Sequence, residues 1–495
     1  MRYISTRDKN HSVLSYQAII DGISPDGGLY VPQELPLLSQ GDLKQLTALS
    51  YEDKAVFILK AFLPEFSEDE LRECVQKSIS RFEDRTVAPI VKLDDTAYVL
   101  ELWHGPTCAF KDVALTILPD LLQKAKQKAG IKEDILILTA TSGDTGKAAL
   151  EGFKNTPGVK IAVLYPTDNV SEHQKLQMMI QDGDNVLPLG IKGNFDDAQT
   201  TVKKIFCDSE SIELFKKAGY LLSSANSINW GRLLPQIIYY FSTYLDLLAA
   251  GEIKEGEKIN FVVPSGNFGN ILAGFYAKQM GLPVNKLICA SNSNNVLTDF
   301  LTTGRYNACR VLQKTISPSM DILISSNTER LIFEISARND ELTSERMKEL
   351  FKTGEYVLTE DELRSIKEVF YADYANDTQT KETLHNVFLE KDYLCDPHTA
   401  VAVTVYNSYL LSEEDATKTV IVSTANPYKF ASDVLDALGY SVPRGDHKAI
   451  LKLQSKTKVA APEAIIKAFE RPILHKEVLE KDQVLQRLLE FVKNK

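Results

Sequence analysis

The chain has 495 residues, of which 44% are hydrophobic and 25% are charged, and its formal net charge at pH 7 is −11. This length exceeds what one hydrophobic core supports, so we expect a globular protein with two or three domains. The negative charge disfavours binding to nucleic acid or to an anionic membrane, because both partners are polyanions.

The cysteines and the N-terminus indicate a cytoplasmic protein. There is no CxxC motif and no metal-ligand spacing to the seven histidines, so we expect reduced, mostly buried thiols and no bound metal. The first residues, MRYISTRDKN, lack the apolar stretch of a secretion signal, and no long uncharged apolar run follows. We therefore expect neither export nor a membrane span. The six cysteines are Cys74, Cys108, Cys207, Cys289, Cys309 and Cys395.

The first 90 residues predict a small α+β domain. A turn cluster, Pro25 to Gly28, separates an apolar helical run from a short strand at Leu29 to Val31. Between residues 43 and 82 the apolar side chains recur at helical spacing, which predicts helices.

Residues 91–250 predict a first α/β domain. Apolar runs of strand length are each followed by a helical pattern, which indicates a parallel sheet covered on both faces. Ser171 is expected to cap one helix, and Asp196 and Asp197 are expected to open another. A long buried helix, residues 226–250, ends the domain. The strands are expected at Asp134–Ala140, Lys160–Tyr165 and Asn185–Leu189.

Residues 251–495 predict a second α/β domain. Apolar runs at Lys258–Val263 and Thr419–Val422 predict strands, and each runs into a loop and then a helix. Residues 328–394 are charged and helical in pattern, which predicts a helical insertion. The run from 473 to 495 predicts a solvated amphipathic helix.

Lys111 is the candidate nucleophile of the chain. It lies in ELWHGPTCAFKDVAL, residues 101–115, among largely apolar neighbours. Burial disfavours the charged ammonium, and the neutral amine is the form that attacks an aldehyde to form a Schiff base. The alternative is a lysine at the start of an amphipathic helix, with its stem on the core and its head in water.

The string HGPTCAFKD, residues 104–112, resembles the HGPT-x-AFKD signature of the threonine synthases, which are fold-type II pyridoxal-phosphate (PLP) enzymes. The segments YISTR and DGGLYVP near the N-terminus also resemble that family, and they set it apart from the dehydratases and cysteine synthases. The resemblance implies an α/β protein with two open, mostly parallel-sheet domains of the tryptophan-synthase-β-like kind. It also implies that Lys111 carries the cofactor PLP. For the N-terminal segments themselves we expect a packing role.

The loop PSGNFGN, residues 264–270, is a candidate anion site. Glycine at a strand-to-helix junction lets backbone N–H groups approach an anion, and the helix N-terminus favours negative charge. The glycine spacing fits neither a Walker A motif nor GxGxxG, and a connection without a ligand is the alternative. The resemblance implies that the loop binds the cofactor phosphate, with Asn270 in place of the usual aspartate. The residues concerned are Gly266, Asn267, Phe268, Gly269 and Asn270.

The loop TSGDTG, residues 141–146, has the same position after another strand, which predicts a second anion site. The hydroxyls of Thr141, Ser142 and Thr145 offer extra donors. The resemblance implies that this loop, including Gly143, receives the substrate α-carboxylate. We expect Asp144 to brace the loop.

A third loop, STANPYKF, follows the late strand. In fold-type II enzymes a serine or threonine hydroxyl faces the pyridine nitrogen of PLP, and Thr424 matches that position. The family pattern reads STAHPAKF, so Asn426 and Tyr428 depart from it. This departure leaves the role of Thr424 intact and removes whatever the usual histidine contributes.

A substrate phosphate needs a further site. Arg232 is the candidate, because its fork of donors suits a phosphate, and Ser227 and Asn229 lie nearby in the chain. Alternatively, Arg232 caps or pairs within the buried helix. The segment DPHTA, residues 396–400, also matches the family but suggests no chemistry, and we expect His398 and His104 to be packed, hydrogen-bonded side chains.

The resemblance implies a carbon–oxygen lyase that converts O-phospho-L-homoserine and water to L-threonine and phosphate, the last step of threonine biosynthesis. Lys111, displaced from the cofactor by the substrate amine, then acts as general base at the α and the β carbon. A monomer or a homodimer is expected. The alternatives are a threonine or serine dehydratase on the same scaffold, a non-catalytic binding protein of this family and, with less support, a nucleotide-dependent dehydrogenase, which GxGxxG would mark.

Overall fold

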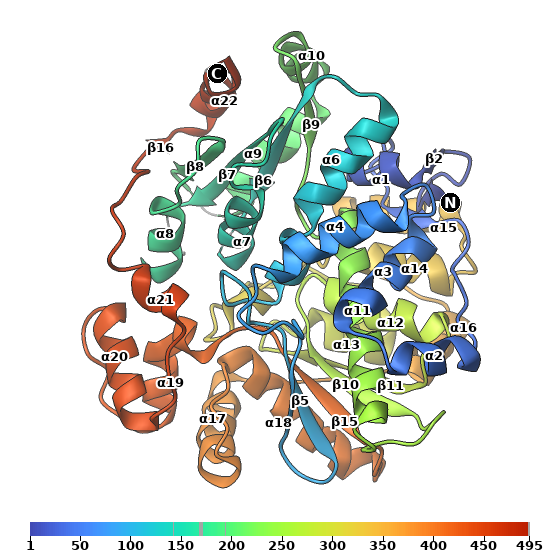
Figure 1. Ribbon diagram of the computed structural model, residues 1–495, viewed down its shortest axis with the longest axis vertical. Helices are drawn as coiled ribbons and strands as arrows, with labels where there is room; N and C mark the ends of the chain where they lie inside the picture. The colour runs from blue at the N-terminus through green and yellow to red at the C-terminus, as the bar shows by residue number, and fades with distance from the viewer. Residues whose placement is uncertain (142, 168–171, 194, 494–495) are drawn as a thin grey trace.

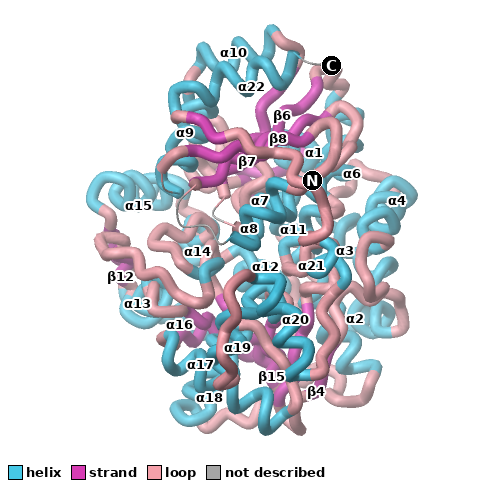
Figure 2. The backbone as a smooth tube through the Cα atoms, turned by 90° about the vertical axis from the view of Figure 1, so that its left-hand side faces the viewer, coloured by secondary structure: helices cyan, strands magenta, loops and turns pink. Residues whose placement is uncertain are grey.

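The computed structural model describes residues 1–141, 143–167, 172–193 and 195–493. Two sheets lie at opposite ends of the long axis, and helices fill the space between and around them (Figure 1). The same separation is visible in the perpendicular view, where β6, β7 and β8 lie at one end and β15 and β4 at the other (Figure 2). The expected α/β class is confirmed.

The N-terminal region combines a three-stranded antiparallel sheet, in the order β2-β1-β3, with four helices. Ser39, Ser50 and Ser67 each precede a helix and accept the N–H of the third helical residue, which fixes where α2, α3 and α4 begin. The elements are β1 (Arg2–Ser5), β2 (Ser12–Leu14), α1 (Ser15–Asp21), β3 (Tyr30–Pro32), α2 (Gln40–Thr47), α3 (Tyr51–Phe62) and α4 (Glu68–Ile79).

The five-stranded sheet is entirely parallel, in the order β16-β8-β7-β6-β9. Helices on both faces bury its central strands, which explains why those strands read as continuous apolar runs. Its strands are β6 (Asp134–Ala140), β7 (Val159–Pro166), β8 (Val186–Ile191), β9 (Tyr220–Ser223) and β16 (Val478–Leu479). The associated helices are α6 (Leu118–Ala129), α7 (Asp144–Phe153), α8 (Glu172–Met179), α9 (Phe195–Cys207), α10 (Ser209–Lys217), η3 (Lys481–Gln483) and α22 (Val484–Lys493).

The six-stranded sheet has the order β14-β11-β10-β15-β5-β4, and only the β4–β5 pair is antiparallel. Its strands are β4 (Ile90–Lys92), β5 (Ala97–Glu101), β10 (Ile259–Pro264), β11 (Val284–Ser291), β14 (Phe370–Tyr374) and β15 (Thr419–Ser423). The small pair β12 (Arg305–Asn307) and β13 (Glu355–Val357) stands apart from it.

The remaining helices lie around the six-stranded sheet and between the two large sheets (Figure 1). They are α5 (Lys111–Leu115), α11 (Trp230–Ala249), α12 (Gly269–Gln279), α13 (Val296–Thr303), η1 (Pro318–Met320), α14 (Thr328–Ile335), α15 (Asp340–Thr353), α16 (Glu360–Val369), α17 (Asp377–Lys391), α18 (Pro397–Glu413), η2 (Pro427–Phe430), α19 (Ala431–Ala437), α20 (Asp446–Thr457) and α21 (Glu463–Lys467).

The predicted strands in both sheets are present within two residues of their expected bounds. The sheets do not follow the expected division at residue 250, because β5 lies in the six-stranded sheet and β16 in the five-stranded one. Strand β14 lies inside the segment expected to be helical. The C-terminal run is also not one solvated helix, since β16 pairs with β8 and α22 buries Leu488. The cap predicted at Ser171 falls outside the described residues.

Helix α11 is the long buried helix that the sequence predicts. It packs against α12, α3 and α5, and nearly all of its side chains are buried although it contains Arg232 and Pro235. No helix in the described ranges is long and apolar enough to cross a membrane. Because α11 packs against α3 of the N-terminal region and α12 of the six-stranded-sheet region as well as against α5, it fixes the position of α5 and therefore of Lys111.

Gly152 allows α7 to pack directly on α5. A Cβ atom at Gly152 would lie 2.1 Å from the carbonyl oxygen of Leu115, whereas one at Gly41, an exposed helical glycine of α2, would meet only Ser39 Oγ at 3.5 Å. We predict that Gly152→Ala lowers the free energy of unfolding by roughly 1–3 kcal/mol through overpacking. Gly41→Ala should be neutral or stabilising, because alanine favours helix. Thermal unfolding midpoints measure both, and equal shifts would contradict this packing argument.

Candidate functional site

Lys111 is the first residue of α5 and is half-buried. Its Nζ lies 5.8 Å from the centroid of the Phe110 ring and has no hydrogen bond or ion pair with any residue that the structure describes. The pKa of Lys111 is lowered to about 8, mainly by burial; Asp144 opposes this shift, and Lys429 and Arg232 contribute to it. The amine is therefore partly neutral near neutral pH, as the sequence suggested.

The conformation of the lysine segment depends on Asp112. This fully buried carboxylate accepts the backbone N–H of Thr107 at 2.8 Å and its hydroxyl at 2.6 Å, so the chain curls around it. A Cβ at Gly105 would lie 2.5 Å from Asp112 Cβ, which explains why glycine occupies that position. The number of residues between HGPT and FKD is thus what allows Thr107 and Gly105 to contact Asp112 and the loop to adopt this conformation.

Thr424 lies beside the lysine segment. It follows the last residue of β15, and its carbonyl oxygen accepts the N–H of Phe110 at 2.8 Å. An antiparallel bridge between Ala109 and Ala425 extends this contact. Thr424 is largely buried, and its hydroxyl has no hydrogen-bond partner among the described residues. The structure therefore brings together two of the predicted cofactor-binding residues, Lys111 and Thr424.

The loop of residues 266–270 links β10 to α12. Phe268, the N-cap residue, is buried with φ of 60°, a left-handed conformation that costs a non-glycine residue of the order of 1–3 kcal/mol. Asn327 holds the loop, because both its backbone N–H and its Nδ2 donate to Asn267 O. The N–H groups of the first turn of α12 have no intrahelical acceptor and remain available to an anion.

Asn270 also offers a donor. Its Oδ1 accepts the hydroxyls of Tyr239 at 2.6 Å and Tyr240 at 2.8 Å, while its Nδ2 is buried and has no partner among the described residues. Buried polar atoms are nearly always hydrogen-bonded, so an orphaned donor at the start of a helix indicates a place for an acceptor.

The loop of residues 141–146 links β6 to α7. Thr141 Oγ1 accepts the N–H groups of Gly143 and Gly146, each at 3.0 Å, and donates to Gly143 O at 3.1 Å. The expectation that the Thr141 hydroxyl is a spare donor is therefore wrong: it holds the loop together. The half-buried Thr145 hydroxyl has no partner among the described residues. Ser142 lies outside the described residues.

Of the three residues expected at a substrate phosphate, Arg232 fits best. Its side chain is buried, its Nη1 donates to Ala225 O at 2.9 Å, and its Nε has no partner among the described residues. No described carboxylate pairs with it, and burial lowers its pKa to about 10. A buried guanidinium without a counter-charge is costly, which keeps Arg232 a candidate for binding an anion.

Asn229 and Ser227 differ in whether their side chains are available to bind a phosphate. The Asn229 side chain caps α11 through Gly231 N–H at 2.8 Å and donates to Ile19 O and Ser224 O at 3.1 Å. Its amide is fully used, so the expectation that it binds phosphate is wrong. Ser227 is half-buried, and its hydroxyl has no partner among the described residues, which leaves it available.

Lys429 is a site residue that the sequence reasoning missed. Its Nζ forms an ion pair with Asp144 Oδ1 at 2.8 Å and donates to Thr107 O at 2.9 Å, and both side chains are almost fully buried. The pattern that singled out Lys111, a lysine among apolar residues, also applies to Lys429 in NPYKFAS. The same test could have found it.

The DPHTA segment contacts the loop of residues 266–270 through the turn that contains Ser319. Asp396 caps α18, and its carboxylate also contacts His398 Nδ1 at 2.6 Å. His398 Nε2 accepts the N–H of Ser319 at 3.1 Å. A Cβ at Gly266 would lie 2.7 Å from Ser319 O, so the Ser319 turn backs the loop at residues 266–270. His398 is thus a packed, hydrogen-bonded side chain, as expected, and so is His104, which contacts Glu101 at 2.8 Å.

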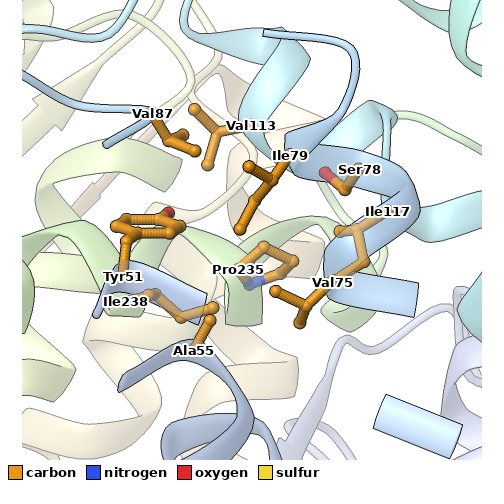
Figure 3. A pocket seen from close by; sticks show the side chains of 10 residues that line it. All are labelled: Tyr51, Ala55, Val75, Ser78, Ile79, Val87, Val113, Ile117, Pro235 and Ile238. Atoms are coloured by element: carbon orange, nitrogen blue, oxygen red, sulfur yellow. The ribbon is translucent and has the colours of Figure 1, made fainter. Parts of the chain in front are cut away.

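Two cavities lie away from Lys111. One, of about 20 Å³, is lined mainly by apolar side chains of α3, α4, α5 and α11 (Figure 3). The other, of about 580 Å³, is lined by Trp103, His104, Tyr393 and Tyr428 among others. Neither contains the amine.

Comparisons with known proteins agree on one family. Sequence profiles described as "Threonine synthase N terminus", "Pyridoxal-phosphate dependent enzyme" and "Threonine synthase, C-terminal" match residues 2–79, 84–359 and 399–484. Threonine synthase from Saccharomyces cerevisiae is 36% identical over 468 residues, which covers 89% of this chain and 90% of that protein. Threonine synthase-like 1 from Homo sapiens is 38% identical over 434 residues, but the chain spans only 58% of its length.

Solved structures lead to the same result. A PLP-bound threonine synthase from Brucella melitensis superimposes with a TM-score of 0.87 at 36% identity and covers 100% of this chain and 99% of its own. Threonine synthase from yeast gives a TM-score of 0.88 at 33% identity, covering 99% of this chain and 98% of its own.

The lowered pKa of Lys111 can be measured directly. Only a neutral amine reacts with acetic anhydride, so acetylation of Lys111 in the ligand-free protein should be half-maximal near pH 8 and should fall at lower pH, where the amine is protonated. Lys192 is the control, because it is exposed and Glu480 raises its pKa. Mass spectrometry of the two peptides across pH 6–11 provides the measurement. Parallel curves for Lys111 and Lys192 would contradict the assignment.

Proposed function

Because this chain belongs to the threonine synthase family of PLP-dependent enzymes, we propose that it converts O-phospho-L-homoserine and water to L-threonine and phosphate. One observation supports this most strongly: the half-buried amine of Lys111, whose pKa is lowered, interacts electrostatically with the buried guanidinium of Arg232, which has no carboxylate partner among the described residues. The first group suits an aldehyde cofactor, and the second suits an anionic substrate.

PLP fits the residues that are present. Lys111 Nζ would hold it covalently, and the N–H groups at the start of α12 together with Asn270 Nδ2 would hold its phosphate. The Thr424 hydroxyl would face the ring nitrogen. When bound, the cofactor supplies an electron-withdrawing ring that stabilises negative charge at the substrate's carbon atoms.

The substrate has two anionic groups, and the chain offers a place for each. The start of α7, with Gly143 and Thr145, would receive the α-carboxylate. Arg232, with the Ser227 hydroxyl, would receive the phosphate. Hydrogen bonds within the chain hold both places: Thr141 holds the first, and Asn327, whose Nδ2 donates to Ser227 O at 3.2 Å, holds the second.

Lys111 carries the proton transfers. A group with a pKa near 8 is neutral in a sufficient fraction of molecules at neutral pH to act as a base, and as an acid once protonated. It takes a proton first from the α carbon and then from the β carbon of the substrate. Phosphate leaves from the γ carbon, and water adds its hydroxyl at the β carbon. The two protons taken up by Lys111 return to the γ carbon, which becomes the methyl group, and to the α carbon, while the remaining proton of water goes to the released phosphate.

We also propose that the protein is cytoplasmic and that it is a monomer or a homodimer. The scattered cysteines support a reducing compartment, because the five that the structure describes are free and four of these are buried.

The activity test is release of inorganic phosphate from O-phospho-L-homoserine in the presence of PLP. The wild type should release phosphate and form threonine in equal amounts, and Lys111→Ala should be slower by roughly 10²–10⁴-fold, the usual contribution of a general base. Lys192→Ala, an exposed lysine, is the control and should match the wild type. Ammonia and a keto acid as products would instead indicate a dehydratase, and no turnover by the wild type would indicate a binding protein.

Arg232→Gln tests the phosphate site. Loss of one or more hydrogen bonds from a charged group, about 1.5–3 kcal/mol, should lower kcat/KM for the phosphorylated substrate roughly 10–100-fold. The thermal unfolding midpoint should not fall, because the guanidinium has no acidic partner to leave unpaired. Arg305→Gln, which removes an exposed arginine paired with Glu355, is the control. Unchanged kinetics with a lower midpoint would assign Arg232 a structural role.

A further inference from the structure

The Lys429–Asp144 ion pair joins the parts of the chain that surround Lys111. Asp144 is the first residue of α7, on the five-stranded sheet, and Lys429 belongs to η2, which follows β15 of the six-stranded sheet. The pair is 2.8 Å long, and its side chains are only 1% and 2% exposed. Lys429 also donates to Thr107 O at 2.9 Å, four residues before Lys111.

Other polar groups complete the surroundings of Asp144. Gln174 Nε2 donates to its Oδ1 at 3.3 Å, and Ser319 Oγ donates to its Oδ2 at 3.5 Å. His398 supports Ser319 from behind. Burial raises the pKa of Asp144, but Lys429, Lys111 and His398 together lower it by more, so the carboxylate is ionised at neutral pH.

Stability is a weak explanation for such a pair. Removing two opposite charges from water costs about as much as their attraction returns, and apolar residues of similar size often do as well. The position of Asp144 suggests another explanation. An ionised carboxylate in the first turn of α7 lies where the proposed function puts the substrate carboxylate, and an uncompensated negative charge there would repel it.

We propose that Lys429 is a positioning residue for the reaction: it neutralises Asp144 and holds the start of α7 against the lysine segment, so that the start of α7 accepts a carboxylate beside Lys111. The inference rests on the proposed function. It also accounts for the lysine in STANPYKF, which the cofactor-binding role of Thr424 leaves unexplained.

The charged groups around Lys111 determine whether each variant raises or lowers the pKa of its nitrogen. These groups are Asp144, Lys429, Arg232 and Asp112. Lys429→Met leaves the Asp144 anion uncompensated, so the nitrogen of Lys111 should hold its proton to higher pH. Asp144→Asn leaves Lys429 uncompensated and should have the opposite effect. The double variant, which lacks both charges, should lie near the wild type.

The test measures three quantities for the wild-type holoenzyme, the two single variants and the double variant. The rising limb of kcat against pH reports the enzyme–substrate complex. We expect it to move up by about one pH unit in Lys429→Met and down in Asp144→Asn. The pH at which the visible absorption spectrum of bound PLP changes should move in the same directions. KM should rise at least about tenfold in Lys429→Met and recover in the double variant.

The alternative is that the Lys429–Asp144 pair only stabilises the fold and has no electrostatic effect on the reaction. In that case both single variants and the double variant would unfold at lower temperature, neither pH dependence would shift, and KM would not recover in the double variant. This result would overturn the proposal. Lys429→Arg keeps the charge and should retain the wild-type pH dependence, which covers the case in which Lys429→Met fails to fold.

Lys381→Met is the matched control. Lys381 forms an ion pair with Asp436 of the same 2.8 Å length, but on the surface between α17 and α19, and its loss should shift nothing. Phosphate release by the wild type tests the proposed function separately. If it is absent while the PLP spectrum still shifts as described, only the reaction assignment fails. If it is present without the shifts, only the inference about Lys429 fails.

Discussion

The site depends on an amine that must lose its charge in a place where charges are poorly solvated. Burial has the largest effect on the pKa of Lys111, and two further cations, Lys429 and Arg232, act in the same direction. Asp144, which has the largest effect of the charged groups, and Asp112 act against them. Two cations and two carboxylates thus surround a nitrogen that is itself partly neutral. Burial, which disfavours the charged form of the amine, decides the direction of the pKa shift.

Holding this balance requires contacts between distant segments. Asn327 joins the loops that carry Asn267 and Ser227, and Arg330, fully buried, donates to Asn327 Oδ1, Ile228 O and Tyr30 O. The N-terminal segment thus reaches the site through its backbone. Its Arg7 is also paired with Glu329 of α14 through two hydrogen bonds, at 2.9 and 2.7 Å. These contacts agree with the packing role expected for YISTR and DGGLYVP, because the segments brace the loops and contribute no chemical group.

The sequence was informative where local patterns determine the structure. Buried parallel strands must be apolar along their length, so β6 and β15 could be located closely. Strand β14, with polar residues in FYADY, is defined by its pairing with β11, which no local pattern reveals. The same distinction holds in the site. Lys111 is singled out by its apolar neighbours together with the resemblance of HGPTCAFKD to the family signature, whereas the role of Asn229 was misjudged because its partners, Ile19 O and Ser224 O, become neighbours only on folding.

Two buried hydrogen-bond donors without partners are the groups of the site best suited to the anions that we propose it binds. Arg232 Nε and Asn270 Nδ2 are both buried and without a partner among the described residues. They belong to α11 and α12, which pack against each other, and each lies near the start of its helix. An aspartate at position 270, as is usual in the family, would accept the same two tyrosine hydroxyls but would add a negative charge. Asparagine keeps those contacts and adds an N–H donor instead. The departure from the family pattern therefore removes a negative charge and adds a donor at the place where we propose that the cofactor phosphate binds.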